Sequence, residues 1–210
     1  MRGILGKIID EYHRRYEEIL DAMYPSFDQT GLQERNLTVN FLAAAETVEE
    51  KEEGKIRPTF LWWTEFQFGD GKHLDGVAFD LEAKEVFLIE SKRLKGEKQA
   101  KETEEDVGTI LSVASDIEKL NSRFNAPVDL GDFSVYGVIL ADSWVGPSQK
   151  RGQAVSILNE WQTRTFFSGR CSIPNAGCLY FEHDKTIDRF VKENIPDCVY
   201  HLLTFVWKIK

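Results

Sequence analysis

The segment from Thr59 to Lys92 constrains the fold of this chain most strongly, because β-branched and aromatic residues are concentrated in it and turn residues interrupt them. In order, it contains TFLWWTEFQF, the turn Gly69-Asp70-Gly71, HLDGVAFD, LEAK and EVFLIESK. Runs of this kind, separated by short turns, are typical of strands joined in hairpins. The sequence therefore predicts a three-strand antiparallel meander.

Helices are predicted before and after this meander. The first has apolar residues at steps of three and four, as in an amphipathic helix. A nearly continuous apolar run at 133–140 predicts a strand buried on both faces. The runs at 177–181 and 199–206 are too short for periodicity to decide between strand and helix. The expected fold class is α/β, a mixed sheet of the meander plus a further strand, flanked by helices. The predicted helices span residues 4–23, 32–46, 103–123 and 149–166.

Composition limits the class of protein. The chain has 210 residues with 42% hydrophobic content, which is typical of one domain with its own core, so a single domain over 1–210 is expected. It contains neither an apolar leader with a cleavage site nor a run of about 20 apolar residues, so a cytoplasmic protein without membrane contact is expected. Three cysteines without a CxxC pair argue against a disulfide framework and a cysteine zinc site.

The net charge of −9 limits how this chain could contact nucleic acid. Bulk attraction to nucleic acid depends on neutralising many phosphates with Lys and Arg, so any contact here must be local. Residues 92–101 contain five basic residues against one acid, Glu97. This segment would hold a nucleic-acid backbone, and the alternative interpretation is a solvated loop. Its candidate phosphate contacts after Lys92 are Arg93, Lys95, Lys98 and Lys101.

The second hairpin of the meander brings two carboxylates together. Whether its loop is Glu82-Ala83 or 81–84, the centre of symmetry is the same, and it places Asp75 directly opposite Glu90. Side chains opposed in this way have Cβ atoms about 4.5–5.5 Å apart, and two like charges there are destabilising unless something neutralises them. A divalent cation would neutralise them.

Magnesium suits such a pair, because it takes hard oxygen ligands and keeps several waters. Lys92 lies two residues beyond Glu90 and therefore shares its strand face. Its ammonium could hold or help to deprotonate a water and offset charge on a phosphate, while the metal polarises the phosphoryl oxygen. Asp75, Glu90 and Lys92 therefore predict a site that hydrolyses phosphodiesters with Mg²⁺ or Mn²⁺.

The first hairpin adds a further acid and a histidine. A turn centred on Asp70 places Glu65 opposite Asp75, although a glycine-containing three-residue turn often carries a bulge that shifts the pairing. His73 lies two residues before Asp75, shares its face and could touch substrate. The neighbouring Trp62-Trp63 pair is expected to be core and sheet face rather than a base-stacking platform.

These residues resemble the PD-(D/E)xK nuclease superfamily, in which an Asp on one strand and E-x-K on the next lie between two helices. The corresponding segments are HLDG at 73–76 and IESK at 89–92. The resemblance covers 31–142 in the order helix, three strands, helix, strand, and implies a restriction-endonuclease-like core. Residues 1–30 would then be a helical N-terminal extension and 143–210 a C-terminal α/β extension.

The resemblance also implies roles for single residues. Asp75 and Glu90 would be metal ligands, the carbonyl of Ser91 could share the metal, and Lys92 would act on the water and the phosphate. Family members often add a Glu from the first core helix, and Glu34 has the corresponding place here. Glu34 and Glu65 are therefore both candidates for the third acidic ligand. The Pro that names the motif is replaced by Leu74.

Two functions from different classes are expected. The first is a metal-dependent nuclease, an endonuclease acting on DNA, which is the family's usual substrate. The alternative is a catalytically inactive nuclease-fold module that binds nucleic acid or a protein partner. The sequence leaves open DNA versus RNA, endonucleolytic versus exonucleolytic cutting, sequence specificity, the pathway and the oligomeric state, a homodimer included.

Overall fold

The computed structural model describes residues 4–22, 34–53, 60–69, 71–94, 97–125, 128–145, 179–186 and 199–210. Its helices are α1 (Ile4–Ala22), α2 (Glu34–Glu53) and α3 (Glu97–Ser115), with 3₁₀ segments η1 (Ile117–Arg123) and η2 (Leu130–Asp132). Its strands are β1 (Phe60–Gly69), β2 (Lys72–Asp80), β3 (Glu85–Arg93), β4 (Ser134–Val145), β5 (Leu179–Thr186) and β6 (Val199–Lys208). The fold class is therefore α/β, as predicted.

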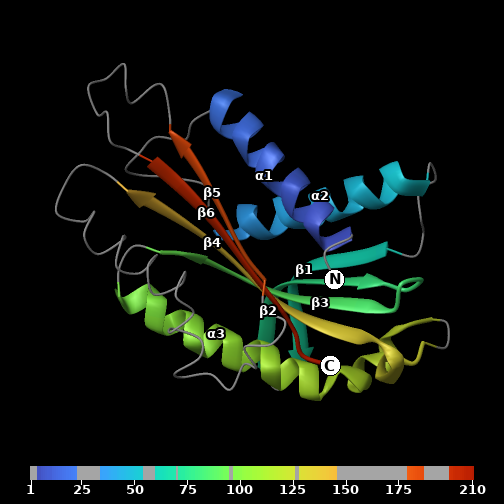
Figure 1. Ribbon diagram of the computed structural model, residues 1–210. Coiled ribbons are helices and arrows are strands. Elements are labelled where there is room, and N and C mark those ends of the chain that lie inside the picture. The colour runs from blue at the N-terminus through green and yellow to red at the C-terminus, as the bar shows by residue number, and fades with distance from the viewer. Residues whose placement is uncertain are drawn as a thin grey trace.

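The described strands form one mixed sheet in the order β1-β2-β3-β4-β6-β5. Neighbours are antiparallel except β3 and β4, which are parallel, so the predicted antiparallel meander of β1, β2 and β3 is confirmed. Helices α1 and α2 lie on one face of the sheet and α3 lies on the other (Figure 1). Each face therefore has its own apolar core.

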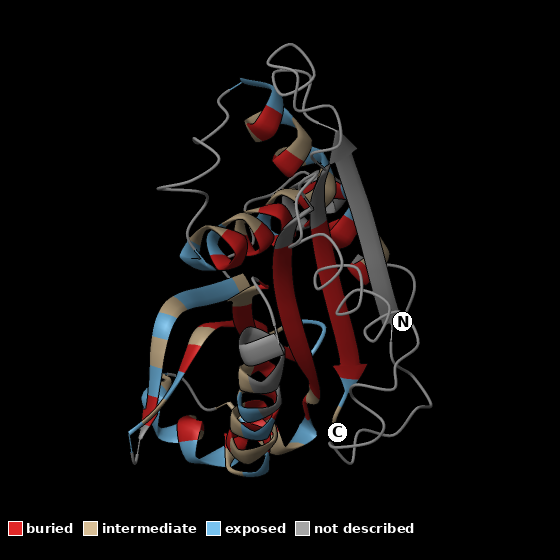
Figure 2. Cartoon of the chain, turned by 90° about the vertical axis from the view of Figure 1, so that its left-hand side faces the viewer, coloured by how far each residue is buried: buried red, intermediate tan, exposed pale blue. Residues whose placement is uncertain are grey.

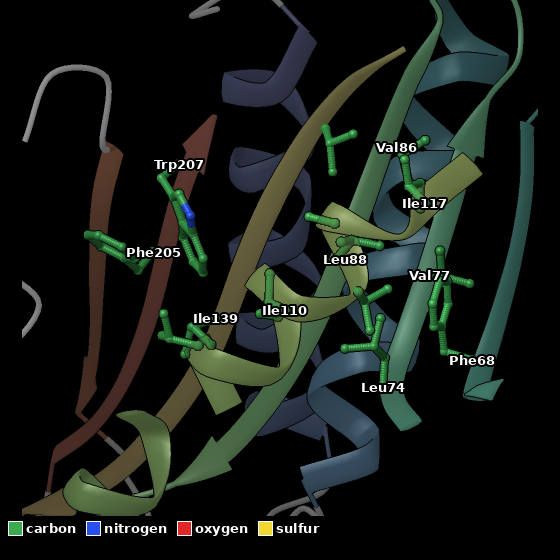
Figure 3. Close-up of a cluster of buried hydrophobic side chains, with 14 of the residues drawn as sticks. Phe68, Leu74, Val77, Val86, Leu88, Ile110, Ile117, Ile139, Phe205 and Trp207 are labelled. Atoms are coloured by element: carbon green, nitrogen blue, oxygen red, sulfur yellow. The ribbon is translucent and has the colours of Figure 1, made fainter. Parts of the chain in front are cut away.

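Strand β4 lies at the centre of the sheet, with β3 on one side and β6 on the other. Its residues alternate between the two cores: Val138 and Leu140 pack toward α1 and α2, whereas Val135 and Ile139 pack toward α3. Figure 3 shows the α3-side core, in which Ile110 faces the sheet. The prediction of a strand buried on both faces is confirmed.

Helix boundaries differ from the sequence-based expectations. Helix α2 continues to Glu53 rather than ending near 46, because the Glu and Lys residues there are good helix formers. Helix α3 begins at Glu97, so the second half of the basic segment is helical, and it ends at Ser115 before η1. The helix predicted at 149–166 lies outside the described residues. None of the helices in the described ranges is long and apolar enough to cross a membrane.

The segment after residue 142 completes the sheet. The two runs for which periodicity did not decide between strand and helix lie in strands β5 and β6. They are strands because β5 pairs with β6 and β6 pairs with β4, and these pairings cannot be read from periodicity. Trp207 of β6 packs against Gly137 of β4 so closely that a Cβ on Gly137 would lie 2.2 Å from its ring. The sheet next to the core strands therefore depends on this later segment.

The expected placement of the Trp62-Trp63 pair in the core is wrong, although both residues lie on the sheet in β1. Trp62 is 36% exposed and Trp63 is 67% exposed, and the adjacent Leu61 is 40% exposed. The reason is topological, because β1 is an edge strand with only β2 beside it, and the helices cover the central strands. Figure 2 shows exposed residues along β1, whereas the described residues of the central strands are mostly buried.

Candidate active site at the ends of β2 and β3

The candidate site lies where β2 and β3 separate. Their pairs run from Asp80 and Glu85 to Gly76 and Ile89, in the register that sets Asp75 opposite Glu90 as the hairpin symmetry predicted. Beyond this point β3 continues beside β4 as far as Arg93. Among the described strands, none pairs with the β2-facing edge of β3 beyond Ile89, and this stretch is called the open edge of β3.

Two carboxylates accept hydrogen bonds from backbone N–H groups at this open edge. The N–H of Ser91 donates to Oδ2 of Asp75 at 2.7 Å, and the N–H of Arg93 donates to Oε1 of Glu34 at 2.8 Å. The N–H and C=O of one strand residue point to the same side, so the carbonyl of Ser91 also faces this edge. Asp75, Glu34 and the Ser91 carbonyl thus converge on one short stretch of β3.

Glu34 is directed to this edge by close packing of α2 on the sheet. Thr38, one helical turn after Glu34, forms a hydroxyl–hydroxyl hydrogen bond of 2.5 Å with Ser91. Gly76 of β2 allows this approach, because a Cβ there would lie 2.5 Å from the Thr38 methyl group. The first turn of α2 is therefore fixed against β3.

Asp75 and Glu90 share a hydrogen bond in a largely buried environment. Glu90 is 8% exposed, and burial, together with the charges of Asp75 and Asp106, raises its pKa to about 9. Burial also raises the pKa of Asp75, although the Ser91 N–H opposes this rise. At neutral pH Glu90 therefore holds the proton and donates it to Asp75.

Lys92 forms an ion pair that the sequence analysis missed. Its Nζ lies 3.1 Å from Oδ2 of Asp106 on α3, with the two side chains 16% and 19% exposed. Burial lowers the pKa of Lys92, but Asp106 and Glu34 outweigh it, so the net shift is upward. The available signal was an acid on the buried stripe of α3, between Thr103 and Ile110, where ionised residues are rare.

Glu65 has the predicted register but other partners. The pairs before and after Glu65 in β1 set it opposite Asp75. The bulge does not disturb this register, because it lies nearer the turn, between Gln67 and Gly69. Its backbone has φ of 52°, and its carboxylate contacts Arg35 and His73 at 3.1 Å each. The structure therefore brings Glu34, rather than Glu65, to the edge of β3, and holds His73 beside Glu65.

The basic residues that were predicted to contact phosphate do not share one environment in the described part of the chain. The guanidinium of Arg93 makes two hydrogen bonds, of 3.1 and 2.7 Å, to the fully buried Asp142 of β4, which ties it to the sheet. Lys95 lies outside the described residues. Lys98 and Lys101 fall within α3, and their side chains also lie outside the described part of the chain.

The donor set at this edge suits a hard divalent cation. Carboxylates and a backbone carbonyl are the oxygen ligands that Mg²⁺ prefers. Burial is the main cause of the raised pKa values of Asp75 and Glu90, and Lys92 only partly opposes the rise for Glu90. Within the described residues, however, no group of three or more His, Cys, Asp or Glu side chains has the geometry of an assembled metal site. The acids are instead bonded to each other, to β3 and to Lys92.

No protein-family model, curated protein or solved structure matches this chain.

Proposed function

We propose that this protein is a metal-dependent nuclease with a restriction-endonuclease-like core, and that DNA is its substrate. The observation that carries the proposal is the set of groups at the open edge of β3: Asp75, Glu90 and the Ser91 carbonyl beside the protonated Lys92. The order α2, β1, β2, β3, α3, β4 supports the same core, and DNA follows from the resemblance to PD-(D/E)xK nucleases.

Each residue has a distinct task in this proposal. Asp75 and Glu90 would hold Mg²⁺ or Mn²⁺, with Glu34 as a further carboxylate at the same edge of β3. The metal would supply polarisation of the phosphoryl oxygen and a water of lowered pKa. Lys92 stays protonated beside Asp106, so it would orient the water and stabilise the charge that grows on the phosphate rather than act as a base.

Cleavage assays with isosteric variants test the proposal. Purified protein is incubated with plasmid, linear duplex, single-stranded DNA and RNA, with Mg²⁺, Mn²⁺ or EDTA. Wild type should cut at least one of these in a metal-dependent manner, and Asp75→Asn and Lys92→Met should lower the rate at least 100-fold. Asp75→Asn keeps an oxygen that can accept the Ser91 N–H, so a loss of activity would not result from leaving that N–H without an acceptor.

Matched controls come from the other end of β3. Asp132→Asn and Lys84→Met remove the two members of an exposed ion pair, and both variants should cut at the wild-type rate. Calorimetric titration with Mn²⁺ gives a second readout, in which Asp75→Asn should lose binding and Asp132→Asn should not. If wild type neither cuts nor binds metal but still binds nucleic acid, the inactive module replaces the nuclease.

A further inference from the structure

Strand β1 exposes three large apolar side chains that the proposed site does not use. Leu61, Trp62 and Trp63 follow one another on an edge strand, and all three are exposed. Large apolar side chains gathered at the surface of a protein often mark a binding site. Successive side chains on a strand point to opposite faces, so Trp62 and Trp63 belong to different faces of the sheet.

Trp63 lies on the same face of the sheet as Glu90, one of the two proposed metal ligands. It is paired with Val77, and opposed residues of an antiparallel pair have side chains on one face. Val77 packs in the core on the α3 side of the sheet, as does Leu88 of β3. Glu90 lies two residues beyond Leu88 and therefore shares that face, and Asp75 is hydrogen bonded to Glu90. From strand geometry, Trp63 and Asp75 lie about 8 Å apart, two residues along and one strand across. That distance equals about two nucleotides at the ~3.4 Å rise of a stacked strand.

Charged groups suited to a phosphate backbone lie along the same edge. Arg35 of α2 and His73, 59% and 51% exposed, both contact Glu65, which lies two residues beyond Trp63. Helix α2 covers the face opposite to that of Trp63, so a nucleic-acid strand stacked on Trp63 would reach Arg35 around the edge of β1. An exposed indole presents a π-face on which any base can stack, and nearby cations can contact the backbone of the same strand. Within a duplex, by contrast, the faces of the bases are covered by their neighbours.

We infer that Trp63 stacks with an unpaired base about two nucleotides from the cut, so that the substrate is single-stranded DNA or duplex DNA with a single-stranded end. This inference rests on the proposed nuclease function, which sets where the cut occurs. A second copy of the chain could instead pair with the edge of β1, since unpaired strand edges join other strands readily. The two occupants differ in what they require of Trp63.

Binding measured in EDTA separates stacking from cleavage. Fluorescence anisotropy with a labelled single-stranded oligonucleotide and a labelled blunt hairpin should show about tenfold tighter binding of the single strand by wild type. Trp63→Ala should remove about tenfold of that affinity and leave hairpin binding unchanged, and Trp63→Phe should restore part of it. Trp62→Ala, the matched control on the other face, should retain most of the preference. Equal affinity of wild type and Trp63→Ala for the single strand would overturn the inference.

The remaining outcomes are also distinguishable. If Trp63→Ala dissociates a dimer in sedimentation without changing nucleic-acid affinity, the surface is an interface between copies and the stacking inference is wrong. Metal-dependent cleavage by a chain without the single-strand preference would overturn only the inference. Trp63-dependent binding without any cleavage would support stacking and overturn the nuclease proposal.

Discussion

Glu90→Gln is expected to stabilise the metal-free protein at neutral and alkaline pH. The ordinary pKa of 4.5 for Glu90 rises to about 9 in the folded chain, chiefly through burial and the charge of Asp75. A raised carboxyl pKa means that the folded state keeps a proton that the unfolded chain releases. Glu90 therefore stabilises the fold fully below about pH 4.5, and this contribution is lost as the pH rises toward 9.

The magnitude follows from the pKa shift. Each pH unit between the two pKa values removes up to about 1.4 kcal/mol, so the upper limit at pH 7.5 is about 4 kcal/mol. Coupling among Asp75, Glu90 and Asp106 spreads this loss over several groups, and about 2–4 kcal/mol is expected. Glutamine does not titrate, and its amide can still donate to Asp75.

Urea denaturation in EDTA, from pH 5 to pH 8, measures the effect. The stability of Glu90→Gln relative to wild type should rise across this range, whereas Glu118→Gln, an exposed carboxylate on η1, should give a difference that changes little. Saturating Mg²⁺ should stabilise wild type more than Glu90→Gln, because the cation replaces the proton that Asp75 and Glu90 share. A stability difference that is flat from pH 5 to 8 would refute the shared-proton account.

Two further predictions concern packing around the site and the sheet. Asp106→Asn should lower kcat for cleavage about 10- to 100-fold by releasing Lys92, with little change in KM, whereas Asp116→Asn, which removes an exposed ion pair with Lys119, should change neither in the same kinetic assay. Gly137→Ala should destabilise by about 1–3 kcal/mol in urea denaturation, because its Cβ would meet the Trp207 ring. Gly108→Ala in α3, where a Cβ meets nothing within 4 Å, should be neutral or stabilising by up to about 1 kcal/mol, and comparable losses in both variants would contradict the packing argument.

The meander was predictable because hairpins are local. A short turn fixes which residues face each other, so the register of Asp75 and Glu90 followed from counting along the chain. Glu65 shows how far this reasoning extends. Its register was also obtained, but its positive φ and its contacts with Arg35 and His73 depend on α2, which is distant in sequence.

Features that depend on distant contacts escaped sequence reasoning. The Lys92–Asp106 pair requires knowing how α3 packs on the sheet, and the Arg93–Asp142 pair requires the parallel pairing of β3 with β4. Trp63 was misassigned because an aromatic run predicts a strand but not whether that strand lies at the centre or the edge of the sheet. Spacing within a segment cannot supply that information.

The carboxylates that accept N–H groups from β3 are also expected to limit aggregation. An open strand edge can recruit a strand from another chain, and β3 would present such an edge beyond Ile89. Asp75 and Glu34 accept the N–H groups of Ser91 and Arg93, so we expect the residues proposed for chemistry to hinder misassembly as well. Asp75→Ala should therefore lower solubility as well as activity, whereas Asp75→Asn should affect activity alone.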